Sequence, residues 1–176
     1  MLKKSLALMC TVLGLTGCAG VSPEVYRDQK PTLDLANYFN GPLTAWGYFA
    51  DRSGEVKRRF TVKMTGEWKG NEGVLTENFV WSDGEKSQRV WRIKKLDAHR
   101  YTGRADDVQG EAMGTAYGNA LQWKYTLLLP VDGKTYAVQF DDWMYQMDDK
   151  TMLNKSVMRK FGFKLGEIVI SFRKGA

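Results

Sequence analysis

The chain has 176 residues, carries 26 lysine and arginine side chains against 20 aspartate and glutamate side chains, and has a formal net charge of +6. This length suits one domain with a sizeable core, and the positive surplus is too dilute to indicate binding to nucleic acid. Both cysteines, Cys10 and Cys18, lie near the N-terminus. The rest of the chain therefore has no disulfide, no thiolate metal site and no cysteine nucleophile.

The N-terminus has the pattern of a bacterial lipoprotein signal. Lys3 and Lys4 precede an apolar run at 6–15 that is too short to span a bilayer, and a Leu-Thr-Gly-Cys motif ends at Cys18. We expect cleavage before Cys18 and acylation of its thiol and α-amine, which holds a soluble domain on a membrane because each buried CH₂ adds ~0.8 kcal/mol. An ordinary signal peptide with a coincidental cysteine is the alternative.

The residue after Cys18 is Ala19, not the aspartate that retains lipoproteins at the inner membrane. We therefore expect the periplasmic face of the outer membrane as the location, with the inner membrane as the alternative. The chain divides into three predicted parts. Residues 1–17 are a signal peptide, 18–31 a lipidated tether, and 32–176 a β-barrel domain.

Residues 32–40 are predicted to form one or two helical turns with Leu35, Tyr38 and Phe39 on one side. Downstream, apolar and polar residues alternate with the period of two that is typical of half-buried strands. This alternation and the turn signals between the runs predict nine strands, at 43–52, 56–68, 74–81, 86–96, 100–106, 121–129, 134–147, 151–160 and 163–173. Residues 107–120, rich in glycine and alanine, are either a further irregular strand or a long loop.

Consecutive strands joined by tight turns, without a crossover helix, predict an all-β fold. We expect an antiparallel up-and-down, calycin/lipocalin-like barrel of eight to ten strands with a short N-terminal helical turn. A sandwich or a half-open sheet is the alternative. The second faces of the strands are too polar for a barrel embedded in lipid, so an outer-membrane pore is excluded.

A series of short motifs resembles the DUF3833 family, which consists of uncharacterised proteobacterial lipoproteins. The motifs occur in order along the chain and include Asp51-Arg52-Ser53-Gly54, Leu75-Thr76-Glu77-Asn78-Phe79, Arg89-Val90-Trp91, Asp106-Asp107-Val108-Gln109-Gly110, Asp141-Asp142-Trp143-Met144-Tyr145 and Lys160-Phe161-Gly162. The resemblance extends over residues 35–173. It implies a lipoprotein with a calycin-like barrel and implies no activity.

Several charged residues share a face with apolar residues. Arg58 has the parity of Phe60, and Glu77 has the parity of Phe79. A three-residue loop after the third strand would place Glu77 opposite Arg89 across the hairpin. Charges are therefore expected on the inward face of the barrel, where they must be paired because an isolated buried ion costs several kcal/mol.

The strand at 134–147 changes the phase of its apolar pattern at Asp141 and Asp142. Phe140 has one parity, whereas Trp143 and Tyr145 have the other. A β-bulge at the two aspartates would explain this change, and bulges are common at barrel rims. We therefore expect Trp143 near the barrel mouth.

Two interpretations of the inward charges remain open. In the first, arginines and acids form an ion network that plugs the barrel. In the second, an arginine below a collar of four aromatic rings, Phe79, Trp81, Trp91 and Trp143, binds the carboxylate or phosphate of an amphiphile whose tail fills the interior. The candidate ligand-binding residues are Arg58, Glu77, Phe79, Trp81, Arg89, Trp91, Asp142, Trp143 and Tyr145.

Catalysis is the weakest interpretation. Asp141 and Asp142 face opposite ways on a strand, and no nucleophile elbow or phosphate loop is present in the sequence. His99 lies in a polar turn and is interpreted as a solvated loop residue. We predict no catalytic residue, no metal and no cofactor.

The predicted function is that of an outer-membrane-anchored periplasmic lipoprotein that binds or senses a hydrophobic or amphiphilic ligand, such as a lipid or fatty acid. The expected partners are the membrane, through lipidated Cys18, and this ligand, with no nucleic acid. The alternative is a non-enzymatic scaffold of the cell envelope with a plugged barrel. An open apolar cavity favours the first and a packed interior favours the second.

Overall fold

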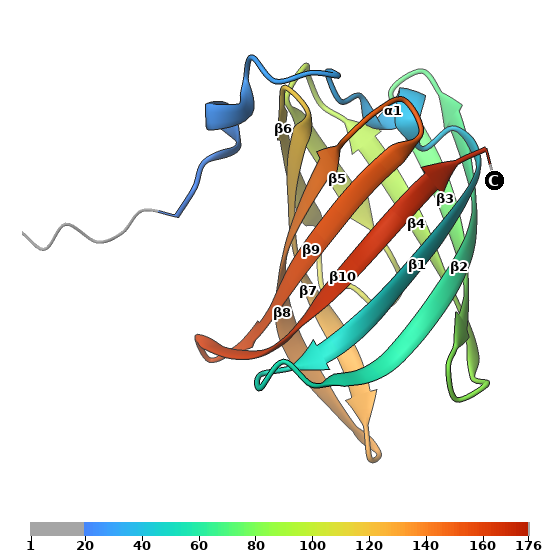
Figure 1. The fold of residues 1–176 in the computed structure, drawn as a ribbon, viewed down its shortest axis with the longest axis vertical. Coiled ribbons are helices and arrows are strands. Elements are labelled where there is room, and N and C mark those ends of the chain that lie inside the picture. Colours follow the sequence, from blue (N-terminus) through green and yellow to red (C-terminus); the bar gives the residue numbers. More distant parts are fainter. Residues whose placement is uncertain (1–19, 176) are drawn as a thin grey trace, which may run out of the picture.

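The computed structural model describes residues 20–175 (Figure 1), so the predicted signal and Cys18 lie outside the described residues. The described chain begins with two short helices, η1 (Pro23–Tyr26) and α1 (Leu35–Tyr38). Ten strands follow, namely β1 (Gly41–Asp51), β2 (Val56–Lys69), β3 (Glu72–Trp81), β4 (Lys86–Lys95), β5 (Arg100–Arg104), β6 (Ala112–Tyr117), β7 (Ala120–Val131), β8 (Lys134–Gln146), β9 (Thr151–Lys160) and β10 (Phe163–Lys174).

The strands form a closed antiparallel barrel in which each strand pairs with its neighbour in sequence. The first and last strands close the ring, with Leu43 of β1 opposite Lys174 of β10 and Asp51 opposite Gly166. The predicted up-and-down barrel is confirmed, and a sandwich or a half-open sheet is excluded. Because the first and last strands pair with each other, their backbone N–H and C=O groups form hydrogen bonds that the edges of an open sheet would lack.

The predicted strands correspond to β1–β5 and β7–β10, within a few residues at their ends. The segment at 107–120, for which two alternatives were open, contains the short strand β6 after an irregular loop. This loop is joined to the sheet by an isolated bridge between Val108 and Leu127.

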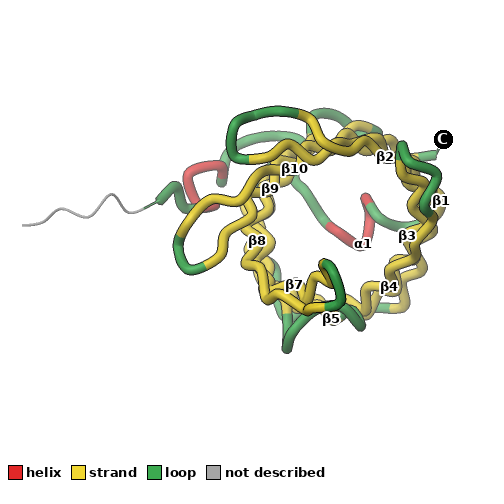
Figure 2. Tube along the Cα trace, turned by 90° about the horizontal axis from the view of Figure 1, so that it is seen from below, coloured by secondary structure: helices red, strands yellow, loops and turns green. Residues whose placement is uncertain are grey.

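The two ends of the barrel differ. One end, which we call the closed end, contains α1 and lies at the top of Figure 1. The opposite end, the open end, is formed by the hairpins β1–β2, β3–β4, β5–β6, β7–β8 and β9–β10. In the view along the barrel, α1 lies inside the ring of strands (Figure 2).

The sequence positions α1 as a plug for the closed end. Asp34 caps the helix by accepting a hydrogen bond from the backbone N–H of Asn37 at 3.0 Å. Leu35 and Tyr38 face the barrel interior and are buried. The Tyr38 hydroxyl donates to the backbone carbonyl of Lys150 at 2.9 Å, which fastens the helix to the turn between β8 and β9.

A glycine permits the close approach of this plug to the barrel wall. A Cβ atom at Gly66 of β2 would lie 1.5 Å from the backbone oxygen of Phe39, the residue that ends α1. Any larger residue at position 66 would therefore displace the plug.

The β3–β4 hairpin has the predicted register. Gly84 has a φ of +87°, which favours glycine, and its N–H donates to the carbonyl of Trp81 at 3.0 Å. Glu77 pairs with Arg89, and Leu75 pairs with Trp91.

The predicted β-bulge in β8 is wrong. The pairing of β8 with β7 and with β9 continues through Asp141 and Asp142 without a shift. The even-numbered residues of β8 therefore face inward along its central part, and Trp143 and Tyr145 face outward. Their apolar character has another cause, because Tyr26 of η1 packs on both rings, with centroid distances of 6.0 Å to Trp143 and 5.4 Å to Tyr145.

Neither helix described for residues 20–175 has the length and apolar character needed to cross a bilayer.

Candidate functional site: the barrel cavity

The barrel encloses a cavity of about 480 Å³ that extends from Phe39 at the closed end to Arg58 and Trp81 at the open end. Side chains from the inward faces of the strands line it. Most of the lining is apolar, and this apolar part includes Phe60, Val62, Met64, Leu75, Trp91, Ile93, Leu121, Trp123, Leu127, Phe140, Met144, Met158, Ile168, Ile170 and Phe172.

Three aromatic rings form a collar near the open end. Phe60, Phe79 and Trp81 lie on neighbouring strands, with centroids 5.0 Å apart for Phe60 and Trp81 and 5.7 Å apart for Phe79 and Trp81. Phe79 and Trp81 are half-buried. Two of the four rings predicted for this collar are thus in place. Trp91 lies deeper in the barrel, and the prediction that Trp143 contributes to the collar is wrong because its ring is outside.

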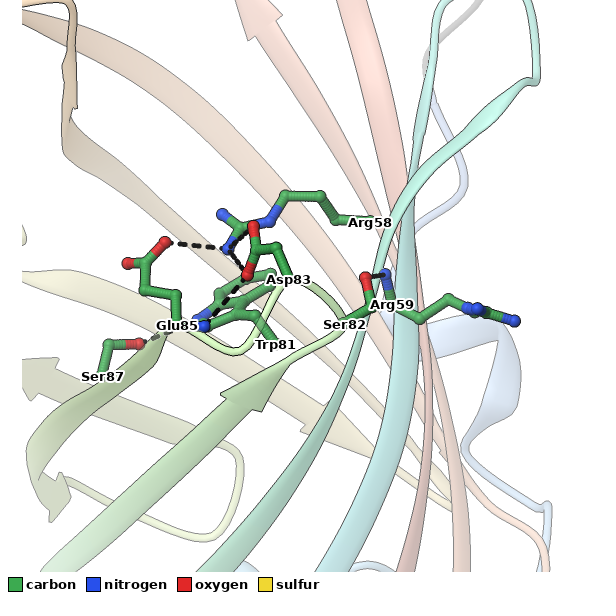
Figure 3. A network of polar contacts seen from close by, with 7 residues as sticks. All are labelled: Arg58, Arg59, Trp81, Ser82, Asp83, Glu85 and Ser87. Atoms are coloured by element: carbon green, nitrogen blue, oxygen red, sulfur yellow. Dashed lines mark hydrogen bonds and ion pairs between the residues drawn. The ribbon is translucent and has the colours of Figure 1, made fainter.

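Arg58 lies at the rim of the open end (Figure 3). Its guanidinium stacks on the Trp81 ring at 4.2 Å and donates to Asp83 at 2.9 Å and Glu85 at 2.8 Å. Both acids belong to the β3–β4 turn. Arg58 has the predicted inward parity, but it lies near the start of β2 at the rim, so its partners are residues of the β3–β4 turn.

Arg89 lies deeper and pairs with Asp107. Its Nε donates to Asp107 Oδ2 at 2.9 Å, and its Nη2 lies 2.7 Å from the same oxygen. Asp107 belongs to the irregular loop before β6, and the backbone bond from Leu128 N–H to Asp107 O at 2.8 Å holds this loop against β7. Glu77 is opposite Arg89 in register, but the ion pair of Arg89 is with Asp107.

Two buried carboxyl groups face the cavity without an ion pair in the described part of the chain. Glu77 is 9% exposed and Asp142 is 6% exposed. Burial raises the pKa of Glu77 to about 7, although the positive charge of Arg89 opposes the shift. Burial also raises the pKa of Asp142 to about 7, against the effect of its polar neighbours Ser156 and Tyr125.

The carboxyl group of Asp142 uses only part of its hydrogen-bonding capacity. It lies opposite Trp123 of β7 and Ser156 of β9 in the barrel wall. Its Oδ1 atom is buried and has no hydrogen-bond partner among the described residues. Buried polar atoms without a partner are rare in folded proteins.

Seven of the nine predicted ligand-site residues line the cavity. They are Arg58, Glu77, Phe79, Trp81, Arg89, Trp91 and Asp142. Trp143 and Tyr145 do not, because they lie on the outer surface beneath η1.

Sequence reasoning missed several polar residues of the cavity, including Asp107, Tyr125 and Ser156. The signal for Tyr125 was available, since it has the parity of the apolar residues in its strand. Asp107 gave no such signal because it lies in an irregular loop, where alternation does not apply.

The described residues offer no metal site, since no three His, Cys, Asp or Glu side chains gather within 20–175. His99 is exposed, and its ring stacks on Tyr117 with centroids 4.0 Å apart.

The fold and the cavity together define an up-and-down antiparallel barrel that is hollow and accessible from one end, which is consistent with a calycin-like barrel. The sequence matches the family DUF3833, described as a protein of unknown function, over residues 12–174, and the chain belongs to this family. No curated protein matches the chain.

Proposed function

We propose that the protein is a periplasmic lipoprotein, anchored in the outer membrane through Cys18, that binds a hydrophobic or amphiphilic ligand such as a lipid or fatty acid inside its barrel. The observation that carries this proposal is the cavity of about 480 Å³. Packed protein cores retain few voids larger than a water molecule. A barrel built as a scaffold has no need for a void of this size.

The size and the lining of the cavity support a single small ligand. Sites for such molecules occupy roughly 300–1,000 Å³ and are mostly apolar, with a few polar groups that set orientation. Here the polar groups are Glu77, Arg89 and Asp142, surrounded by aromatic and aliphatic side chains. This combination suits a molecule with one polar end and an apolar remainder.

The open end is the route of access. The closed end is occupied by α1, whose Leu35 and Tyr38 are buried, whereas the collar residues Phe79 and Trp81 are half-buried. A ligand therefore passes the collar and places its apolar part against the interior walls.

The described chain begins beside the closed-end half of the barrel. Tyr26 of η1 packs on Trp143 and Tyr145, which lie toward the closed end of β8. This contact leaves the open end free to receive a ligand.

The anchor is tested by Cys18→Ser. This variant should lose all labelling by radioactive palmitate, and it should be either a soluble periplasmic species or a species that still bears its signal, because Cys18 is the proposed route to the membrane. A variant that stays membrane-bound after its signal has been cleaved would contradict the anchor.

The ligand cavity is tested with the neutral fluorescent probe N-phenyl-1-naphthylamine, titrated into delipidated Cys18→Ser protein. Two substitutions at adjacent half-buried positions of β10 form a matched pair. Ile168 lines the cavity and Val169 has the opposite parity. Ile168→Trp fills the cavity and should abolish saturable binding, whereas Val169→Trp should retain it.

Circular dichroism and thermal melting establish that both variants are folded. Absence of saturable binding by the parent protein, or equal loss in both variants, would contradict the proposal and favour the scaffold.

A further inference from the structure

The charged residues of the cavity lining are predominantly acidic. Two arginines, Arg58 and Arg89, face three acids, Glu77, Asp107 and Asp142. Any polar end of a bound ligand meets this set of charges first. Their pairing therefore indicates which kind of polar group the cavity accepts.

Both arginines are already engaged. Arg58 is paired with Asp83 and Glu85 at the rim, and Arg89 is paired with Asp107. The charge of each guanidinium is thus already balanced by a carboxylate, although Arg58 Nε at the rim has no hydrogen-bond partner among the described residues. A carboxylate or phosphate would instead add negative charge beside Glu77 and Asp142, which like-charge repulsion disfavours.

The acidic side chains that line the cavity outnumber the arginines. Asp142 is 6% exposed, faces the cavity, and leaves Oδ1 without a partner among the described residues. A buried acceptor in this state keeps the desolvation penalty that a hydrogen-bond donor would remove. The complementary group is a donor, and a charged donor gains more than a neutral one.

The rings around Asp142 suit a cation. Trp123 is its cross-strand neighbour on the same inward face. Tyr125 stacks on Phe140 at 4.9 Å and contacts Trp91 edge-on at 5.4 Å. Aromatic faces of this kind attract ammonium groups, and the attraction is stronger away from water.

We propose that the cavity binds an amphiphile whose polar end is a hydrogen-bond donor, preferably a protonated amine, held by Asp142 Oδ1 with its apolar part in the barrel interior. This inference rests on the proposed function and narrows its ligand to amphiphiles with a donor group, so that a fatty acid becomes the disfavoured example. Burial raises the pKa of Asp142 to about 7, and the nearby charge of Arg89 offsets only part of this rise.

The test is displacement of N-phenyl-1-naphthylamine by three amphiphiles with the same alkyl chain, namely dodecylamine, dodecanol and dodecanoate, at pH 8 and below their micelle-forming concentrations. The probe is neutral, so its own binding does not depend on the inference. We expect the amine to displace it at a concentration about tenfold lower than the alcohol, as a charge-assisted hydrogen bond predicts. The carboxylate should be the weakest of the three.

Asp142→Asn tests whether Asp142 is the residue that holds the amine. It removes the charge at nearly constant shape, so the advantage of the amine over the alcohol should disappear while displacement by the alcohol changes little. Glu77→Gln should reduce the advantage less, because Asp142 Oδ1 is the unpartnered atom.

An amine no better than the alcohol in the parent protein, or a carboxylate that binds best, would overturn the inference. This comparison does not need the variants to fold. Failure of the neutral probe to bind at all would instead overturn the proposed function, so the two failures are distinguishable.

Discussion

The closed and open ends of the barrel are built from the same strands, but a buried helix fills the closed end, whereas exposed turn residues surround the open end. At the closed end, Leu35 is 2% exposed and the Tyr38 hydroxyl is bonded to the turn between β8 and β9. At the open end, the Arg58 side chain is 33% exposed and pairs with turn residues (Figure 3). The closed end thus contributes core packing, and the open end gives access to the cavity.

The two ends of the barrel therefore separate the residues that stabilise the fold from the residues that give access to the cavity. Hydrophobic contacts around α1 are removed from water and contribute to folding. The polar groups of the cavity, Glu77 and Asp142, are buried without an ion pair in the described part of the chain, and burial of such groups opposes folding. Their presence is better explained by binding than by stability.

The largest expected effect is at the closed end. Leu35→Ala should lower the free energy of unfolding by about 3 kcal/mol, because a buried leucine loses its contacts and leaves a void. Phe79→Ala at the open end should cost only about 1 kcal/mol, since its ring is half-buried and faces the cavity. Urea denaturation of both variants measures the difference. Equal losses would remove the proposed contrast between the ends.

A second prediction concerns the polar groups between the ends. Asp142→Asn should raise the free energy of unfolding by about 2 kcal/mol at pH 8 and have little effect below pH 4. The folded pKa of Asp142, about 7, is above its ordinary value of 3.8. The folded state therefore binds more protons between these values, and this group's contribution to stability is lost as the pH rises through 7.

Denaturation curves of the parent and the Asn variant across this pH range test the sign. If the variant were less stable than the parent at pH 8, the ionised carboxylate would be stabilised by a partner, and the surplus of acid in the cavity would be refuted.

A third prediction concerns the outer surface near the closed end. Trp143→Ala should cost about 1 kcal/mol, because it removes one of the rings on which Tyr26 packs. It should also make residues 20–31 more susceptible to limited proteolysis. Binding of N-phenyl-1-naphthylamine should be unchanged, since Trp143 is outside the barrel. Weakened probe binding would place this ring in the ligand site after all.

The smallest expected effect is at the open end. Arg58→Ala should lower the free energy of unfolding by less than about 1 kcal/mol, because ion pairs in contact with solvent contribute little. Arg58 pairs with Asp83 and Glu85, which are both well exposed. A loss of several kcal/mol in a thermal melt would indicate instead a buried pair of the kind expected from the sequence.

The barrel itself could be predicted from alternation and turn chemistry. The register of Glu77 opposite Arg89 followed from a three-residue turn that ends at Gly84, and the structure has this register. Such local rules determine strand pairing when each strand pairs with its neighbour in sequence.

The remaining features depend on contacts between distant segments. The phase change in β8 indicates a bulge when the strand is read alone, but Trp143 and Tyr145 are apolar because Tyr26, more than a hundred residues earlier, covers them. The partner of Arg89 was missed for a similar reason, since Asp107 reaches it from an irregular loop. Alternation within a strand contains no information about either contact.

Native mass spectrometry of the Cys18→Ser protein, after gentle purification without detergent, shows whether the barrel carries a ligand. We predict a population that carries one small amphiphile per chain, released by organic extraction and absent from the Ile168→Trp variant but present in Val169→Trp. A bare polypeptide mass in the parent protein, with no saturable uptake when amphiphiles are added, would contradict the claim that the barrel is a ligand carrier.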